Sequence, residues 1–137
     1  MSSRDEIERV LKDAYAARKR GDVDAILRVF SQDVRFQLAG SADVSPVAHR
    51  ADGADQFRAL LVNLVKTFEL LDHKIISMMI DGDGATVHWR GKFRSSVTGE
   101  TVETELVDVI KLKEGRIASF IEFCDTALAA HLMGQGR

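Results

Sequence analysis

The stretch TVETELVDVIKLKEGRI, residues 101–117, decides the fold. Apolar and polar residues alternate over residues 101–113, which predicts a half-buried strand. Glu114-Gly115 is a turn signal, so residues 116–124 are expected to return as an antiparallel neighbour. One side of the first strand carries Val102, Thr104, Leu106, Asp108, Ile110 and Leu112. The acid Asp108 is therefore expected on the more apolar side of the strand.

Placing Asp108 on an apolar face has an energetic consequence. An ionised carboxylate without partners is strongly destabilised there, so the group must be paired, protonated or open to a water-filled cavity. A hairpin turn near residues 97–100 sets Asp108 roughly opposite Trp89. The same register pairs opposite charges on the outer face, Arg90 and Lys92 with Glu105 and Glu103. Two interpretations remain open: a buried acid satisfied by backbone donors, a tyrosine or a histidine, or an acid of a functional site.

The neighbouring segments extend the sheet. Further strands are expected at residues 72–80, 85–95 and 116–124, separated by the turn signals Asp81-Gly82-Asp83-Gly84 and Thr98-Gly99. Such short connections imply antiparallel hairpins. In the last of these strands both alternating sets are largely apolar, which favours a sheet whose second face is also covered, for example by another subunit. Glu122 lies in this strand and is either a second pocket carboxylate or a rim residue.

The N-terminal part has helical spacing. Ser3 followed by Glu6 is a capping-box pattern, and the helix is expected to run to about Arg20 and to end at Gly21. The basic run Arg18-Lys19-Arg20 then lies in the last turn of the helix, where positive charges interact favourably with the helix dipole. Asp22 is expected to cap a short second helix, after which residues 34–38 alternate as a strand.

A loop and two more helices complete the prediction. Residues 39–51 are small and polar, contain the only proline, and are expected to form a loop that could serve as a lid. Asp52 is expected to cap the strongest helix, which carries apolar residues at helical spacing from Phe57 to Phe68. A short terminal helix is expected over Thr126–Met133. Helices followed by a strand meander predict an α+β domain with helices on one face of a curved, mainly antiparallel sheet.

Composition limits the class of protein. The 137 residues are 45% hydrophobic and 29% charged with a net charge of −2, which indicates one globular domain over residues 1–137 and gives no basic footprint for nucleic acid. No signal pattern and no apolar stretch of about 18 residues is present, so no membrane association is expected. The single cysteine, Cys124, excludes an internal disulfide and is compatible with a reducing compartment, so the expected location is cytoplasmic.

The histidines point to no metal. His49, His73, His88 and His131 lack the spacing of metal ligands, so no metal site and no cofactor are expected. His49 lies beside Arg50 in the predicted loop and could contact a ligand as an acid, a base or an anion-binding group.

The order helix, helix, strand, helix and strand meander, together with GDVDAI at residues 21–26 and ELVDVIKLKEGRI at residues 105–117, resembles the NTF2-like superfamily. The SnoaL-like and ketosteroid isomerase-like members are the most similar. The resemblance implies a cone of three helices against a bent sheet, a short C-terminal helix, an apolar pocket and a homodimer formed through the sheet. Asp108 resembles the protonated acid of ketosteroid isomerase. Leu38 and Ala14 stand about where that enzyme has its base and its tyrosine, with Tyr15 one place away, so the steroid reaction itself is not implied.

The residues and the resemblance together predict a protein that binds a small apolar or aromatic carbonyl compound and performs acid/base chemistry without a cofactor. Asp108 is the expected acid and Glu122 the base or a water-positioning group, with Tyr15 and His49 as further polar candidates. The expected cavity lining is Phe36, Leu38, Phe57, Trp89, Leu106 and Phe120. The alternative is a non-catalytic ligand-binding or dimerisation module, in which Asp108 only anchors a neighbouring strand or loop. A protein-transport adaptor is a third possibility.

Overall fold

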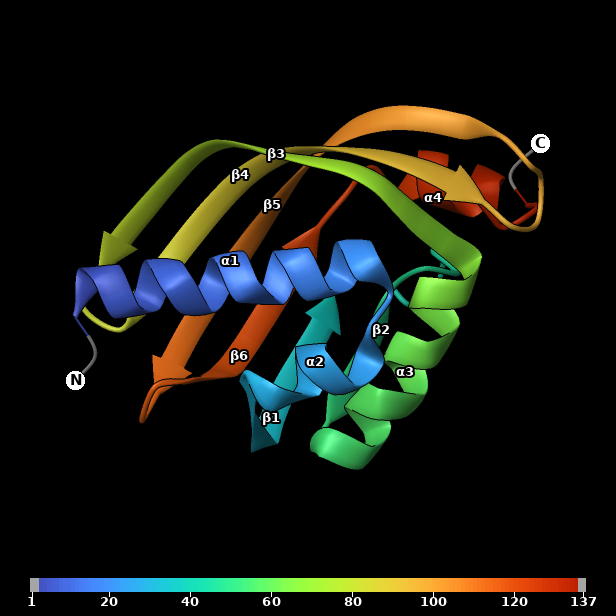
Figure 1. Cartoon of the computed structure of the whole chain (residues 1–137). Coiled ribbons are helices and arrows are strands. Elements are labelled where there is room, and N and C mark those ends of the chain that lie inside the picture. The colour runs from blue at the N-terminus through green and yellow to red at the C-terminus, as the bar shows by residue number, and fades with distance from the viewer. Residues whose placement is uncertain (1–2, 136–137) are drawn as a thin grey trace.

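A computed structural model of the chain describes residues 3–135, which form four helices and six strands (Figure 1). In chain order these are α1 (Arg4–Arg20), α2 (Val23–Arg28), β1 (Phe30–Leu38), β2 (His49–Asp52), α3 (Ala54–Thr67), β3 (Phe68–Asp81), β4 (Gly84–Ser95), β5 (Thr101–Lys113), β6 (Arg116–Phe123) and α4 (Thr126–Leu132). The predicted α+β class and the order of the elements are confirmed.

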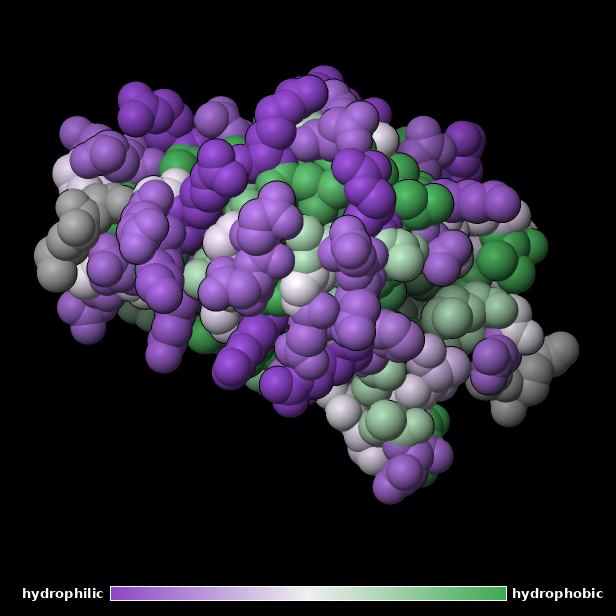
Figure 2. All heavy atoms as spheres, turned by 90° about the horizontal axis from the view of Figure 1, so that it is seen from below, coloured by the Kyte–Doolittle hydropathy of each residue, from purple (hydrophilic) through white to green (hydrophobic). Residues whose placement is uncertain are grey.

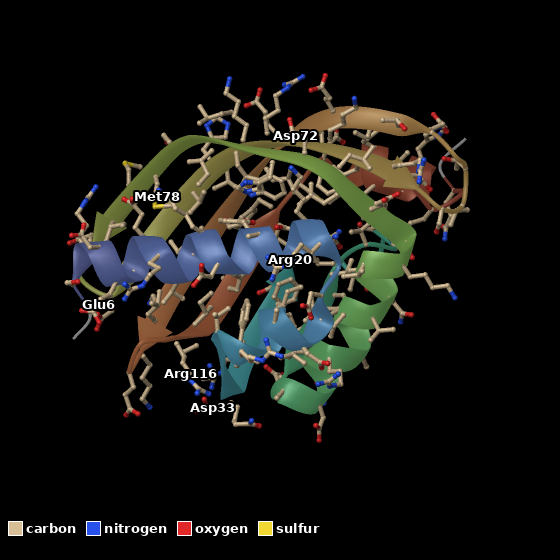
Figure 3. All side chains as sticks on the ribbon, in the orientation of Figure 1. Glu6, Arg20, Asp33, Asp72, Met78 and Arg116 are labelled. Carbon is tan, nitrogen blue, oxygen red and sulfur yellow. The ribbon has the colours of Figure 1, made fainter. Side chains whose placement is uncertain are left out.

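The strands form one bent sheet in the order β2-β1-β6-β5-β4-β3. All neighbours are antiparallel except β1 and β6, which are parallel. Figure 1 shows α1, α2 and α3 on the concave side of this sheet, with α4 near the far ends of β4 and β5. The outer sides of the helices are mostly hydrophilic (Figure 2). Figure 3 shows charged side chains such as Arg20 and Asp72 at the surface. The core therefore lies between the helices and the sheet.

Helix α1 begins and ends where its capping residues predict. The Ser3 hydroxyl accepts a hydrogen bond from the Glu6 amide at 3.1 Å, and the Glu6 carboxylate accepts one from the Ser3 amide at 3.1 Å. Gly21 ends the helix with φ of 70°, a left-handed conformation that costs glycine little. These caps fix the length of the helix and so the position of the residues on its buried face.

Two local predictions are wrong. Residues 39–51 are not all loop, because His49–Asp52 form the short edge strand β2, paired with Arg35–Leu38 of β1. Asp52 does not cap α3 either. Gly53 occupies the capping position without a side-chain hydrogen bond, and the Asp52 amide instead donates to Gln56 at 2.9 Å. A four-residue edge strand is too short to show alternation, and its pairing comes from a partner that sequence spacing does not reveal.

The sheet tolerates its large inward-facing aromatics because of one glycine. A Cβ atom at Gly91 would lie 2.6 Å from both Trp89 Cζ3 and Phe93 Cε1, which is closer than carbon atoms approach. Both rings therefore lean over the backbone of residue 91. Both residues line the cavity described below.

Ser95 anchors the terminal helix, and we expect Ser95→Ala to destabilise the fold by about 1–3 kcal/mol. Its side chain is buried, donates to the Leu132 carbonyl of α4 and accepts from the amides of Val97 and Thr98 at 3.1 Å each. The variant leaves these groups unpaired. Urea unfolding measures the effect, with the exposed neighbour Ser96→Ala as the control. Equal stability of the two variants would contradict the anchoring role.

Within residues 3–135, no helix has the length and apolarity needed to cross a bilayer.

Candidate functional site

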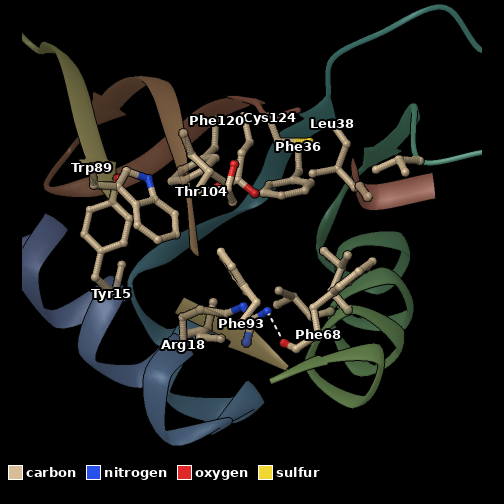
Figure 4. Close-up of a pocket in the computed structure, with 18 of the residues that line it drawn as sticks. Tyr15, Arg18, Phe36, Leu38, Phe68, Trp89, Phe93, Thr104, Phe120 and Cys124 are labelled. Atoms are coloured by element: carbon tan, nitrogen blue, oxygen red, sulfur yellow. Dashed lines mark hydrogen bonds between the residues drawn. The ribbon is translucent and has the colours of Figure 1, made fainter. Parts of the chain in front are cut away.

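A cavity of about 130 Å³ lies between the helices and the concave face of the sheet (Figure 4). All six residues expected to line it do so: Phe36, Leu38, Phe57, Trp89, Leu106 and Phe120. An apolar cavity of about 150 Å³ is large enough to hold benzene, so this one is matched to a single ring. Figure 4 shows Phe36, Phe120 and Thr104 on one side of the hollow and Arg18, Phe93 and Phe68 on the other.

Few polar side chains reach this apolar cavity. Glu122 of β6 and Tyr15 of α1 are among the lining residues, as predicted. Arg18 also lines it, although the sequence suggested only a helix-dipole role for this residue. The Arg18 guanidinium donates to the Phe68 carbonyl at 2.6 Å (Figure 4). Asp125 lines the cavity as well, but it is exposed and caps α4 by accepting from the Leu128 amide at 3.0 Å. Glu122 and Arg18 are therefore the charged side chains left to meet a ligand within mainly apolar walls.

Asp108 lies on the inner side of the sheet and is fully buried. Its Oδ2 accepts a hydrogen bond from the Tyr15 hydroxyl at 2.6 Å and another from Trp89 Nε1 at 2.8 Å. Asp108 was expected to touch the ligand, but it is not one of the cavity-lining residues and lies behind them. The expected pairing of Asp108 with Trp89 is off by two residues, since Asp108 pairs with Val87 and Trp89 pairs with Leu106. The long indole side chain still reaches the carboxyl group.

Asp108 and Glu122 are direct cross-strand partners on β5 and β6. Burial, and then the neighbouring Glu122 carboxyl, raise the pKa of Asp108 well above its ordinary value. Asp108 Oδ1 is buried and receives no hydrogen bond from any described residue. A proton on Oδ1 would be directed away from Oδ2, which accepts from Tyr15 and Trp89. The raised pKa therefore favours the protonated form of Asp108.

The other polar groups around the pair stay protonated. Burial, together with Asp108, raises the pKa of the Tyr15 hydroxyl far above its ordinary value, so the group remains a hydrogen-bond donor. Burial raises the pKa of the Cys124 thiol to about 11, so this cavity-lining residue is a neutral thiol. Cys124 packs as the small hydrophobe that its sequence context indicated.

His73 of β3 supports the site from behind and was not predicted as a site residue. Its ring stacks on Tyr15 with centroids 4.2 Å apart and lies 4.5 Å from the ring of Trp89. Its Nε2 is buried without a hydrogen-bond partner among the described residues. Partial burial lowers the pKa of His73 to about 4, so the ring is neutral at pH 7. Nothing in the sequence near His73 indicates this stack, because Tyr15 and Trp89 come from other elements.

The depressed pKa of His73 predicts a loss of stability in acid. The unfolded chain binds this proton near pH 6.5 and the folded chain only near pH 4, so its stabilising contribution is complete above pH 6.5 and is lost as the pH falls to about 4. Asp108 contributes in the opposite sense, because its pKa is raised. The unfolding free energy of wild type should fall between pH 7 and pH 4 by about 1 kcal/mol more than that of His73→Phe. The expected difference is this small because solvent screens the half-buried ring.

Urea unfolding at the two pH values measures this difference. His49→Phe, on the exposed edge strand β2, is the matched control and should behave as wild type. The same acid loss in wild type and His73→Phe would contradict the prediction.

His49 does not join the site. It is exposed on β2 and lines a second hollow with Arg50, Gln56 and Asn63. His49 was expected to contact a ligand, but it is not among the residues that line the first cavity, because pairing with β1 places it on β2 in the wall of the second hollow.

The outer face of the sheet carries the predicted charge pairs. Arg90 pairs with Glu105 and Lys92 with Glu103 in the β4–β5 register. The Arg90 guanidinium lies 3.7 Å from both Glu103 and Glu105, and His88 Nε2 lies 2.6 Å from Glu105. Such exposed pairs contribute little to stability. Within residues 3–135, no cluster of three or more histidine, cysteine, aspartate or glutamate residues is arranged to hold a metal ion.

Comparison with solved structures gives the same fold. A putative isomerase from Bacillus subtilis superposes with a TM-score of 0.86 at 15% identity, covering 98% of this chain and 96% of that one. An NTF2-like protein of unknown function from Burkholderia pseudomallei gives 0.81 at 20% identity, covering 98% and 100%. An LEH-like epoxide hydrolase from M. tuberculosis gives 0.73 at 17% identity, covering 96% and 91%. At these identities the likeness establishes the fold and no activity.

The family is established by sequence. No curated protein matches the chain significantly. The model of the SnoaL-like domain, however, matches residues 11–120, which include α1 from Leu11 onward, the whole sheet except the end of β6, and the Asp108 position. The six-stranded cone, with helices packed on its concave face, is the NTF2-like and ketosteroid isomerase-like architecture of the solved relatives. The chain is therefore a member of the SnoaL-like domain family with an NTF2-like fold.

Proposed function

We propose that the cavity binds a small apolar or aromatic carbonyl compound and that Glu122 exchanges a proton with it, without a cofactor. The observation that carries this proposal is the Glu122 carboxyl in the wall of a mainly apolar cavity, directly beside the buried acid Asp108. A carboxyl group in the cavity wall beside a buried carboxyl group with a raised pKa is suited to acid/base catalysis. A putative isomerase and an LEH-like epoxide hydrolase among the similar structures support an enzymatic interpretation.

In this proposal the two acids have different roles. Glu122 touches the ligand and is the catalytic base. Asp108 acts through Glu122 as a positioning residue, because its Oδ1 proton holds the Glu122 carboxylate while Tyr15 and Trp89 hold Asp108. This assignment revises the expectation that Asp108 itself is the acid that meets the ligand.

The chemistry follows from the position of Glu122. A carbonyl compound bound with an adjacent C–H toward Glu122 loses that proton to the carboxylate, and the electron pair of the broken bond moves onto the carbonyl oxygen. Return of the proton to another carbon completes an isomerisation, and attack of the carbon on a second centre forms a ring. The mainly apolar walls lower the local dielectric, which strengthens electrostatic interactions with the ligand.

Acetophenone, a single-ring carbonyl compound, is a direct probe of this proposal. In methyl-labelled protein we expect it to shift the resonances of Leu38 and Leu106, two cavity-lining residues. Carbon NMR titration of the side-chain carboxyls should show one Asp or Glu protonated at pH 7 in wild type and none in Asp108→Asn. Absence of acetophenone binding, or ionisation of every carboxyl group at pH 7, would overturn the proposal. Binding without any proton exchange would support the non-catalytic ligand-binding module instead.

We also propose that a second copy of the chain covers the outer face of the sheet. Val107 pairs with Phe123 and Val109 with Ile121 on this face, and Phe123 is 49% exposed. Charges of both signs surround these apolar residues, as in the Arg90–Glu105 pair, so the surface can complement itself across a two-fold axis.

The oligomeric state tests this surface. We expect wild type to sediment as a dimer and Phe123→Asp as a monomer, because the variant places a charge in the centre of the interface. Val44→Asp changes an 82% exposed residue in the loop before β2 and is the matched control. A monomeric wild type, or a dimeric Phe123→Asp, would contradict the proposal.

A further inference from the structure

Arg18 is the cavity residue that the proposed acid/base pair leaves unexplained. Its guanidinium lines the apolar cavity and donates one hydrogen bond, to the Phe68 carbonyl at 2.6 Å. A guanidinium has five N–H donors, and the described residues supply Arg18 with no other hydrogen-bond acceptor. Donors are therefore left for a molecule that occupies the cavity.

The positive charge of Arg18 also points to a ligand in the cavity. Burial lowers the pKa of the guanidinium, and the attraction of Glu122 raises it again, without a hydrogen bond between the two groups. An arginine remains a cation even so, because its ordinary pKa lies above 12. A cation in apolar walls is stabilised by an anion that contacts it, and Glu122 acts only through space. A ligand oxygen that becomes negative during the reaction would supply that contact.

Arg18 lies in a different environment from the two cations that follow it in the same helix. Lys19 and Arg20 follow it directly in α1, and both are exposed. Lys19 lies 3.8 Å from Asp72 on the surface, as an ordinary solvated pair does. Figure 4 shows Arg18 instead beside Phe93 and Phe68 in the cavity wall. The helix dipole accounts for the surface cations but does not require a buried one.

We infer that Arg18 is the oxyanion-binding residue of the cavity, and that the ligands are single-ring enolisable carbonyl compounds and acidic phenols. This inference rests on the proposed function, because Glu122 supplies the proton acceptor. The C–H or O–H bond breaks, the proton passes to a Glu122 oxygen, and the electron pair remains as negative charge on the ligand oxygen, which pairs with Arg18. The total charge inside the cavity stays constant, since the negative charge only moves from Glu122 to the ligand.

The test compares 4-nitrophenol with 4-nitrotoluene, which have nearly the same shape, although only the phenol can form an oxygen anion. In wild type we expect the phenol to bind about tenfold more tightly or better, since hydrogen bonds to a charged group are the stronger ones. Visible absorption should show the bound phenol as the phenolate at a pH below its own pKa. Arg18→Met should bind the two compounds within about threefold of each other and should lose the phenolate absorption.

Three variants complete the test. Arg20→Met removes the same charge from the exposed end of α1 and should behave as wild type. Arg18→Lys keeps the charge as a point cation and should recover part of the preference. Glu122→Gln should no longer take the proton from 4-nitrophenol, but it should still prefer the preformed phenolate at alkaline pH.

The outcomes separate the two proposals. If both compounds bind wild type equally and Arg18→Met changes neither, the role of Arg18 is overturned while ligand binding in the cavity stands. If neither compound binds wild type, the proposed function and the inference both fail. If Arg18→Met does not fold, the ligand pair on wild type and on Arg18→Lys decides the question.

Discussion

Glu122→Gln is expected to slow the exchange of the methyl protons of acetophenone in D₂O by about 10²- to 10⁴-fold relative to wild type. The glutamine side chain has nearly the same shape as glutamate and can still accept a hydrogen bond from Asp108, but it cannot take a proton from the ligand. Loss of the methyl signal in the proton NMR spectrum measures the exchange rate directly. The methyl protons lie next to the carbonyl group, so their exchange reports formation of the enolate.

Asp108→Asn is the matched control for this measurement. The asparagine carbonyl can accept from Tyr15 and Trp89, and its amide can donate to Glu122, so the variant reproduces the hydrogen bonds of the neutral acid. We expect it to fold and to retain much more exchange activity than Glu122→Gln. If Asp108→Asn is as inactive as Glu122→Gln, Asp108 transfers the proton itself. Full activity of Glu122→Gln would remove Glu122 from the mechanism.

Phe57→Ala is expected to destabilise the fold by about 3–5 kcal/mol. Phe57 of α3 is fully buried, and its ring centroid lies 4.6 Å from that of Phe30 and 4.7 Å from that of Phe36. These rings belong to β1, so the substitution removes the packing that holds α3 on the sheet. It also enlarges the cavity, which Phe57 lines.

Urea unfolding monitored by circular dichroism measures this loss. Val62→Ala, on the same helix but 49% exposed, is the control and should change the unfolding free energy by less than about 1 kcal/mol. A cost below about 1 kcal/mol for Phe57→Ala would show that α3 is held in place by other contacts.

The sequence predicted the sheet and the face on which Asp108 lies. Both depend on the alternation of neighbouring residues along a strand. Strand alternation has a period of two, so residues 101–113 assign Asp108 to a face without any knowledge of distant contacts. The same argument placed Trp89 and Leu106 in the cavity lining. The partners of Asp108 were not predictable in this way, because Tyr15 lies 93 residues away in the chain.

Arg18 was missed although a signal exists. Ile7, Leu11 and Ala14 form the buried stripe of α1, and Arg18 follows Ala14 by four residues on the same side. A favourable interaction with the helix dipole already explained a cation at position 18, as it explains Lys19 and Arg20. A charged residue on an apolar helical stripe points to a site in the same way as an acid on an apolar strand face.

The position of His49 could not be derived from sequence. Strand β2 has four residues and exists only because β1 provides an edge for it. A short polar segment near a proline is equally typical of a loop. Whether it forms a strand or a loop depends on pairing with a distant part of the chain.

The parallel pairing of β1 with β6 ties the first third of the chain to its last quarter. Asp108 and Glu122 meet across the local β5–β6 hairpin, but Tyr15 reaches Asp108 only after ends distant in sequence have joined, a step with a large entropic cost that slows folding. Recovery of ligand binding during refolding should accordingly coincide with the final, slowest kinetic phase, and shortened chains that lack β6 should bind nothing.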